Sequence, residues 1–354
     1  MKYDLSNAIR RTKELTLNED RKGILVRCIG FGPVESPKVP PLENCVFPRD
    51  TRSYMDAVIS RHMRWFEAHE ALDDDYIPAL KPFLGIAEHS CFMGGEVRYG
   101  GNTSYQEPVL DDIAGWRTLT LDENRPHYRL LMDCMAYLKE KSREYGYYVS
   151  LRGFDGLMDI ANAIRGNDIL YDLYDEEEET KAFIDFCADA CLWTSQNQRR
   201  YADVVEGGYL SGQSLWMPGN AIGHLSEDLS SMCSPKTYEE FGLPYTKKAL
   251  DHFDYASLHV HSLGRSCIPL FRKLEKFRIF QLTDDPNQPS GMDVYKEYAP
   301  YFEDVLVNVD LDARTLRDNL DFLSRHRAIV NLNAKSIREA QETIDLIRSR
   351  SPLS

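Results

Sequence analysis

Short apolar runs alternate with longer amphipathic stretches along most of the chain. Many of the runs are rich in β-branched and aromatic residues, which is typical of strands buried on both faces. The pattern is clearest near the C-terminus, where a helix over 315–326, a strand over 328–332 and a helix over 336–350 follow one another. Such alternation predicts a parallel sheet covered by helices. The runs that predict strands lie at 24–28, 76–80, 147–151, 208–215, 256–261, 278–282, 305–309 and 328–332.

Eight predicted strands indicate an α/β protein with the (β/α)8 TIM barrel architecture, which eight parallel strands close. A chain of 354 residues fits one such barrel, so we expect a single domain over 1–354. Residues 1–75 then form an N-terminal extension and covering loops, with a proline-rich segment before a helix over 51–71. The glycine-rich stretch at 94–101 predicts a hairpin.

Composition narrows the classes of partner and the cellular compartment. The formal net charge is −14, and an anionic surface repels both nucleic acid and acidic membranes. The first six residues lack the apolar core of a signal peptide, and no run reaches the roughly 18 apolar residues that span a bilayer. The eight cysteines are scattered, which favours reduced thiols. We therefore expect a cytoplasmic protein that acts on a small molecule.

The sharpest chemical signal is the pair His259 and His261 at the end of a predicted strand. Residues two apart on a strand point to the same face, so both imidazoles should project toward the mouth of the barrel. Imidazole is a common ligand of zinc and similar divalent metals. The pair is therefore a candidate metal site, although one histidine could instead bond within the barrel interior while the other ends the strand.

Polar residues also collect near the ends of other predicted strands, as a shared pocket requires. Asp284 and Asp285 follow the sixth strand and are candidates for a general base or metal support, or for helix capping before Pro286. Arg152, after the third strand, is a candidate for holding an anionic group. The candidate substrate-binding residues are Glu88, Trp216, Asn220, Asn331 and Asn333.

Several stretches resemble the uroporphyrinogen decarboxylase superfamily, and the likeness runs from about residue 70 to the C-terminus. They are Gly153…Arg165-Gly166…Leu173-Tyr174-Asp175, Glu227-Asp228-Leu229…Ser234-Pro235, and Leu258-His259-Val260-His261. The resemblance implies a TIM barrel. The superfamily contains a heme-pathway decarboxylase and zinc methyltransferases that move methyl groups between corrinoid proteins and thiols. Its members often pair, so the resemblance also implies a homodimer.

The chain departs from the pattern of both branches. The decarboxylase has an arginine-rich motif after its first strand, whereas the matching stretch here has Arg27 alone. Its aspartate, tyrosine and late histidine fall near Pro82, Asn162 and Ala334, so decarboxylation of uroporphyrinogen is disfavoured.

The methyltransferases carry a His-x-Cys pair and a second cysteine after the last strand. His259 matches the histidine, His261 replaces the first cysteine, and the second cysteine falls at 331–333. Imidazole and amide in place of two thiolates make a harder, more Lewis-acidic metal site.

Three functional hypotheses follow from the residues and the resemblance. The first is metal-assisted methyl transfer, with zinc or another divalent metal on His259 and His261 and a corrinoid carried by a partner protein. The second is a metal-free decarboxylase or lyase in which a histidine acts as acid or base. The third is a non-catalytic accessory barrel.

Overall fold

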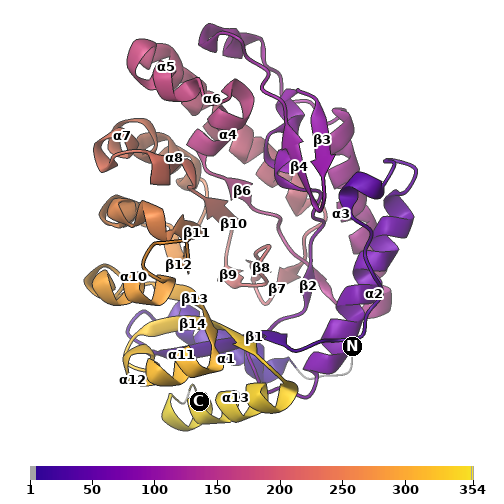
Figure 1. The fold of residues 1–354 in the computed structure, drawn as a ribbon, viewed down its shortest axis with the longest axis vertical. Helices are drawn as coiled ribbons and strands as arrows, with labels where there is room; N and C mark the ends of the chain where they lie inside the picture. The colour runs from indigo at the N-terminus through magenta and orange to yellow at the C-terminus, as the bar shows by residue number, and fades with distance from the viewer. Residues whose placement is uncertain (1–4, 352, 354) are drawn as a thin grey trace.

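The computed structural model describes residues 5–351 and 353 of the chain. Its main sheet has seven strands, all parallel, in the order β1, β14, β13, β12, β11, β10 and β6. Figure 1 shows these strands on the inside with helices around them, which confirms the predicted α/β class. The strands are β1 (Gly23–Phe31), β6 (Phe154–Asp155), β10 (Ala221–Ser226), β11 (Tyr255–His261), β12 (Phe277–Thr283), β13 (Leu306–Asp312) and β14 (Arg327–Ala334).

Three smaller sheets accompany the main one. A parallel pair joins β2 (Ala79–Leu80) to β5 (Tyr148–Val149). An antiparallel hairpin joins β3 (Val97–Gly100) to β4 (Thr103–Gln106), as the glycine-rich stretch predicts. The third sheet is antiparallel and contains β7 (Val204–Val205), β8 (Gly208–Leu210) and β9 (Trp216–Pro218).

The predicted closed eight-stranded ladder does not form among the described residues. Beside β1 the Asp75 N–H donates to the Val26 carbonyl at 2.7 Å, but side chains accept the donors of β1 itself. The Val26 N–H donates to Asp75 Oδ2 at 2.7 Å, and the Cys28 N–H donates to Asp74 Oδ2 at 2.7 Å. A carboxylate satisfies these donors as well as a strand carbonyl would. β2 is therefore left with β5 in a separate sheet.

A similar interruption separates β5 from β6. The Arg152 N–H donates to Gln198 Oε1 at 2.8 Å, and the Leu151 N–H donates to the Leu210 carbonyl at 2.9 Å. Because these donors bond outside the main sheet, the predicted strand at 147–151 shrinks to the two residues of β5. The predicted strand at 76–80 is likewise reduced to the two residues of β2.

The predicted fourth strand at 208–215 is wrong. Residues 208–210 form β8 of the small antiparallel sheet, and the strand that enters the main sheet is β10, eleven residues beyond the end of β8. Its sequence, Ala-Ile-Gly-His-Leu-Ser, carries Gly223 at φ 97° and a histidine, which break the apolar run that marks the other strands. The position of β10 decides which residues reach the site.

The helices cover the outside of the sheet. The predicted helix over 51–71 is α2, and that over 336–350 is α13, whereas the helix over 315–326 is divided into α11 and α12 at Asn319. The α-helices are α1 (Ser6–Leu17), α2 (Thr51–His69), α3 (Pro126–Tyr145), α4 (Leu157–Arg165), α5 (Ile169–Asp175), α6 (Glu177–Arg199), α7 (Pro235–Phe241), α8 (Leu243–Leu250), α9 (Ile268–Phe271), α10 (Gly291–Glu297), α11 (Ala313–Asp318), α12 (Leu320–Leu323) and α13 (Ile337–Arg350). Short 3-10 helices lie at η1 (Leu42–Asn44), η2 (Ile86–His89), η3 (Cys91–Met93), η4 (Ile113–Thr118), η5 (Leu229–Met232), η6 (Ser262–Cys267) and η7 (Ala299–Tyr301).

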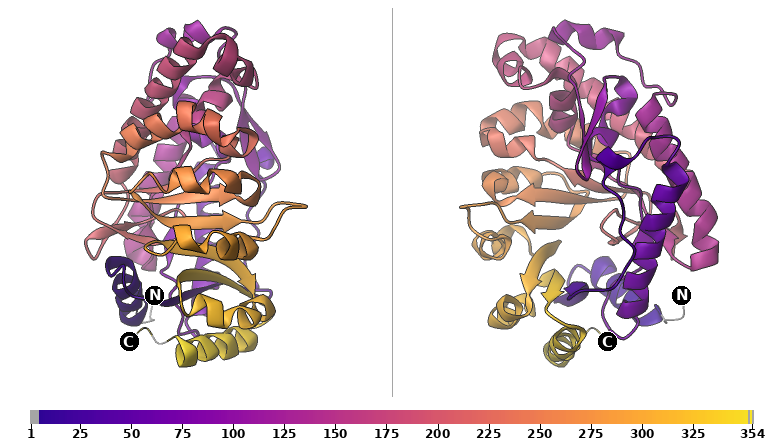
Figure 2. Two further views of the ribbon diagram at one scale, coloured as in Figure 1. Left: turned by 90° about the vertical axis from the view of Figure 1, so that its left-hand side faces the viewer. Right: turned by 45° about the vertical axis from the view of Figure 1, so that its right-hand side comes forward.

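A buried carboxylate joins the first and last helices to the sheet. Asp75 Oδ1 pairs with Arg11 Nε of α1 at 2.6 Å, and its Oδ2 pairs with Arg348 Nη2 of α13 at 2.9 Å. The same Oδ2 accepts the Val26 N–H of β1. Figure 2 shows α1 and α13 at the same end of the molecule, where these contacts hold them.

Two further sequence expectations can be compared with the structure. Within residues 5–351 we find no helix with the length and apolar character needed to cross a lipid bilayer. All eight cysteines are free thiols. The first four residues, on which the expectation of no signal peptide partly depends, lie outside the described residues.

Candidate functional site

The two histidines of β11 converge, as the alternation of strand residues predicts. Their ring centroids are 4.8 Å apart and the rings are nearly perpendicular, at 86°. His259 is the more buried of the two, with 17% of its side chain exposed against 31% for His261. The pair lies at the carboxyl end of the strand, the edge at which α/β barrels place their chemistry.

Asp228 completes a group of three side chains that could hold a metal ion. Its Oδ1 lies 3.9 Å from His259 Nε2 and 3.6 Å from His261 Nε2. One ligand atom from each of the three residues lies within 4.8 Å of the others. We call this group the histidine–aspartate triad. Asp228 is not among the predicted site residues, because the sequence pattern does not reveal β10, the strand that it follows.

Partners on the far side of each ring hold the two histidines in place. Gln281 Oε1 lies 2.8 Å from His259 Nδ1, and Asp285 Oδ1 lies 2.7 Å from His261 Nδ1. When Nδ1 carries the proton and donates it to these oxygens, each Nε2 keeps its lone pair and faces Asp228. Burial lowers the pKa of His259, although the Gln281 bond and Asp228 oppose the shift, and this favours the neutral, metal-binding form.

Only one of the two predicted aspartates touches the histidines. Asp285 Oδ2 accepts the Leu263 N–H at 2.8 Å, and although burial opposes the shift, this bond and the contact with His261 lower the pKa of Asp285. Its carboxylate is therefore charged and fixed at neutral pH. Asp284 is exposed, and its Oδ1 accepts the N–H of Gly291, the first residue of α10. Asp284 therefore bonds to the first turn of α10, whose N-cap residue is Ser290.

Arg152 and Glu88 form a buried ion pair through Arg152 Nε and Glu88 Oε1. Glu88 Oε2 also accepts the Leu84 N–H at 3.1 Å. The guanidinium lies over the ring of Phe83, 5.4 Å from its centroid. Because Glu88 already neutralises the guanidinium charge, the predicted anion-holding role of Arg152 receives no support from this geometry.

Further titratable groups extend from this ion pair toward the triad. His89 Nε2 lies 3.5 Å from Asp155 Oδ1, and the ring of His224 lies 5.4 Å from that of His259. Burial raises the pKa of Asp155 to about 7, although Arg152 opposes the shift. Burial also lowers the pKa of His89 and His224 well below the usual range. Asp155 is thus the one of these three groups whose pKa lies near neutral pH, while His89 and His224 are held in the neutral form.

Trp216 and Asn220 lie away from the triad, contrary to the expectation that they follow the fourth strand. Both precede β10, at its amino end, whereas Asp228 follows the strand. The Trp216 indole N–H donates to the Val205 carbonyl at 2.7 Å in a small apolar cluster. Asn220 Nδ2 donates to the His252 carbonyl at 2.9 Å. These contacts explain both residues as structural.

A cavity of about 560 Å³ adjoins the triad through Gln281, which lines the cavity and also bonds to His259. Asn331 lines the same cavity; its Nδ2 donates to Asp310 Oδ1 at 2.7 Å and its Oδ1 accepts from Arg27 at 3.2 Å. Asn333, in contrast, is exposed and pairs in register with Gly30. Of the two predicted asparagines, Asn331 is thus placed to meet a substrate.

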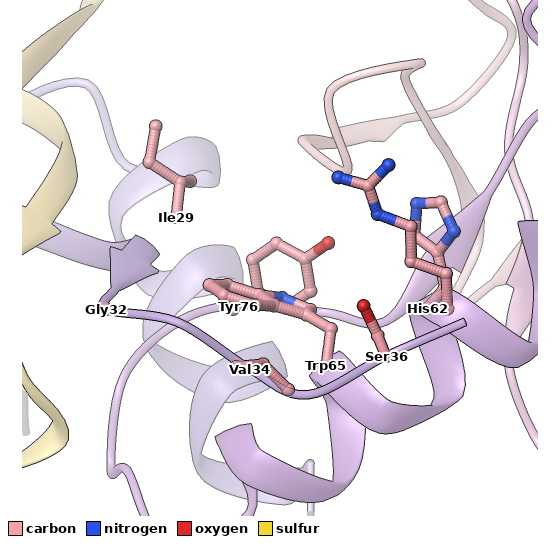
Figure 3. Close-up of a pocket in the computed structure, with 8 residues that line it drawn as sticks. Ile29, Gly32, Val34, Ser36, His62, Trp65 and Tyr76 are labelled. Atoms are coloured by element: carbon pink, nitrogen blue, oxygen red, sulfur yellow. The ribbon is translucent and has the colours of Figure 1, made fainter. Parts of the chain in front are cut away.

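A second cavity of about 380 Å³ opens beside the first and shares four of its lining residues. Figure 3 shows Tyr76 together with Trp65 and His62 of α2 around this cavity, with Val34 and Ser36 on the loop that passes in front of them. The shared residues are Ile29, Arg61, His62 and Tyr76. The two cavities therefore form one cleft beside the triad.

Comparison with known proteins gives a likeness in fold alone. The chain superposes on a methyltransferase from Methanosarcina mazei with a TM-score of 0.61 and 10% sequence identity, over 98% of this chain and 99% of the other. No family model matches the sequence. No curated protein matches it either.

Proposed function

We propose that this protein is a divalent-metal-dependent enzyme that transfers a methyl group between a small organic substrate and a corrinoid carried by a partner protein. His259, His261 and Asp228 would hold the metal, with zinc as the expected ion. The cleft beside them would hold the substrate. We also propose that the chain is a divergent member of the uroporphyrinogen decarboxylase superfamily.

The observation that carries the proposal is the arrangement of donors in the triad. Both Nε2 atoms face one carboxylate oxygen, while the two Nδ1 atoms are occupied by Gln281 and Asp285. Two imidazoles and one carboxylate are a donor set that catalytic metal sites use, because three protein ligands leave a position open for substrate. A bound divalent metal would supply Lewis acidity and lower the pKa of a substrate thiol or hydroxyl.

The residues of the chain have separate roles in this proposal. Asp285 fixes His261, and its fixed charge stabilises a cation bound beside that ring. Gln281 fixes His259 and forms part of the cavity wall, so a substrate in the cavity lies next to a ligand of the metal. Burial raises the pKa of Asp155 to about 7, so its carboxyl would exchange a proton near neutral pH.

Support for methyl transfer comes from the likeness in fold, which covers nearly the whole length of both chains. The exchange of thiolates for imidazole and carboxylate predicts a preference for a harder substrate atom than sulfur, so oxygen or nitrogen donors belong in the test. The metal-free lyase and the accessory barrel remain the competing functions.

The test is turnover of free methylcobalamin, used in place of the corrinoid protein, by zinc-loaded protein in the presence of a panel of thiols, alcohols and amines. We expect demethylation that depends on one acceptor class and falls at least about 100-fold, or roughly 2.7 kcal/mol, in His261→Ala. Turnover of methylcobalamin that survives both this substitution and a chelator would contradict a metal-dependent transfer. Absence of turnover with every acceptor, together with capture of a corrinoid protein, would support the accessory barrel.

A further inference from the structure

The amine of Lys81 faces the 560 Å³ cavity without a partner among residues 5–351 and 353. Lys81 directly follows β2 and lines the cavity, yet no hydrogen bond or ion pair involves its Nζ in the described part of the chain. A surface lysine is solvated, but an unpaired amine that lines a cavity is placed to meet whatever enters it.

The surroundings of Lys81 favour the neutral amine. Burial, and then the nearby Arg152 guanidinium, lower the pKa of Lys81 to about 7, while Glu88 opposes the shift. The other titratable groups that interact with it are His89 and His224, both of which burial keeps neutral. A desolvated lysine next to a second cation is a known way of producing a nucleophilic amine at neutral pH.

The backbone leaves room for this amine at Gly212. A Cβ built at residue 212 would lie 2.7 Å from Lys81 Nζ and 2.9 Å from its Cδ. Glycine at this position therefore allows the lysine side chain to lie along the cavity wall.

The other charged residues that line the 560 Å³ cavity indicate that its ligand is an anion. Arg27 and Arg61 line the same cavity as Lys81, and Asp310 is the one acidic residue of the described lining. This excess of cations stands out in a chain whose net charge is −14. A cationic lining concentrates anions, and a carboxylate is the small anionic group that arginine binds best in bidentate fashion.

We propose that Lys81 is the nucleophilic amine of this cavity and forms an imine with a small carbonyl compound that carries a carboxylate, such as an oxo acid. The Nζ lone pair attacks the carbonyl carbon, protons pass to the carbonyl oxygen, and water leaves as the C=N bond forms. No oxidant or metal takes part. The proposal is therefore independent of the triad and of methyl transfer.

The test is reductive trapping of metal-free protein with glyoxylate and cyanoborohydride, followed by peptide mapping. Cyanoborohydride delivers a hydride to the C=N bond, so each imine becomes a stable carboxymethyl-lysine. We expect Lys81 to be labelled at least about tenfold faster than exposed Lys247 at pH 7, because the lowered pKa of Lys81 leaves much of its amine neutral there. Labelling of Lys81 should rise with pH and reach half its maximum near pH 7.

Three controls make the outcome decisive. Lys81→Arg should abolish the adduct at that peptide, while Lys247→Arg should leave labelling of Lys81 unchanged. Acetaldehyde lacks a carboxylate. The ratio of its labelling rate to that of glyoxylate should therefore be lower at Lys81 than at a free lysine analogue. Labelling of Lys81 no faster than that of Lys247 in the wild-type protein would overturn the proposal, and it would do so even if Lys81→Arg failed to fold.

If acetaldehyde and glyoxylate label Lys81 in the same ratio as they label the free analogue, the carboxylate part of the proposal is overturned. Because the experiment uses metal-free protein, its failure says nothing against the triad. Failure of the methylcobalamin assay, in turn, leaves the labelling result unaffected.

Discussion

At the scale of single residues, the site depends on side chains that do not themselves reach the proposed metal. Asp285 lies on the far side of His261 from Asp228, at 2.7 Å from Nδ1, and it is held by the Leu263 N–H. Its neighbour Asp284 has the same chemistry but bonds to the start of α10. Two adjacent aspartates thus have different roles, which the sequence could propose only as alternatives.

This difference gives a matched pair of variants. Asp285→Asn should weaken zinc binding about 10- to 100-fold, because the amide no longer orients and polarises His261 as a carboxylate does. Asp284→Asn should leave zinc affinity within about twofold of the wild-type value. Competition with a chromophoric chelator measures both affinities, and equal losses in the two variants would contradict the role assigned to Asp285.

Residue patterns predicted part of this site and missed the rest for a physical reason. The convergence of His259 and His261 follows from the two-residue period of a strand, so sequence alone was enough to predict it. Asp228 reaches the same point from β10, whose glycine and histidine hide the strand in the sequence. Lys81 carries no local signal, because its importance comes from a cavity built by distant segments.

At the scale of elements, the parallel strands were the most predictable feature and the closure of the sheet the least. The strands β11 to β14 are long and apolar, and each overlaps the run that predicts it. The gap beside β1 arises from Asp74 and Asp75, whose carboxylates accept backbone donors of that strand. Such substitution of side chain for backbone depends on tertiary position, so no periodicity reveals it.

The carboxylate of Asp75 should also contribute strongly to stability, because it holds α1 and α13 against β1. Asp75→Asn removes the charge that pairs with Arg11 and Arg348, and it leaves the buried Arg11 with the exposed Asp73 as its charged partner. We expect the free energy of unfolding, from urea denaturation, to fall by about 3–5 kcal/mol.

An exposed ion pair provides the control for this variant. Arg200 and Glu123 pair at 2.7 Å with 51% and 43% of their side chains exposed, so Glu123→Ala should cost less than about 1 kcal/mol. A loss in Asp75→Asn no larger than that of Glu123→Ala would show that the buried pair does not hold the terminal helices.

At the scale of the whole molecule, the carboxyl ends of β10, β11 and β12 bring together the triad and its supporting residues. Asp228 follows β10, the two histidines end β11, and Gln281 and Asp285 belong to the end of β12. The cavity lies on the other side of Gln281, so ligand site and metal site share one wall. The likeness in fold to a methyltransferase covers 98% of this chain, and it shows the architecture alone.

The most direct test of the account is the zinc content of protein that has been stripped of metal, reloaded with zinc and freed of excess by gel filtration. We expect about one zinc per chain in the wild-type protein and less than about a tenth as much in Asp228→Ala and in His259→Ala, with all three proteins folded by circular dichroism. Zinc retained in full by either variant, or absent from the wild-type protein, would contradict the assignment of the triad as a metal centre.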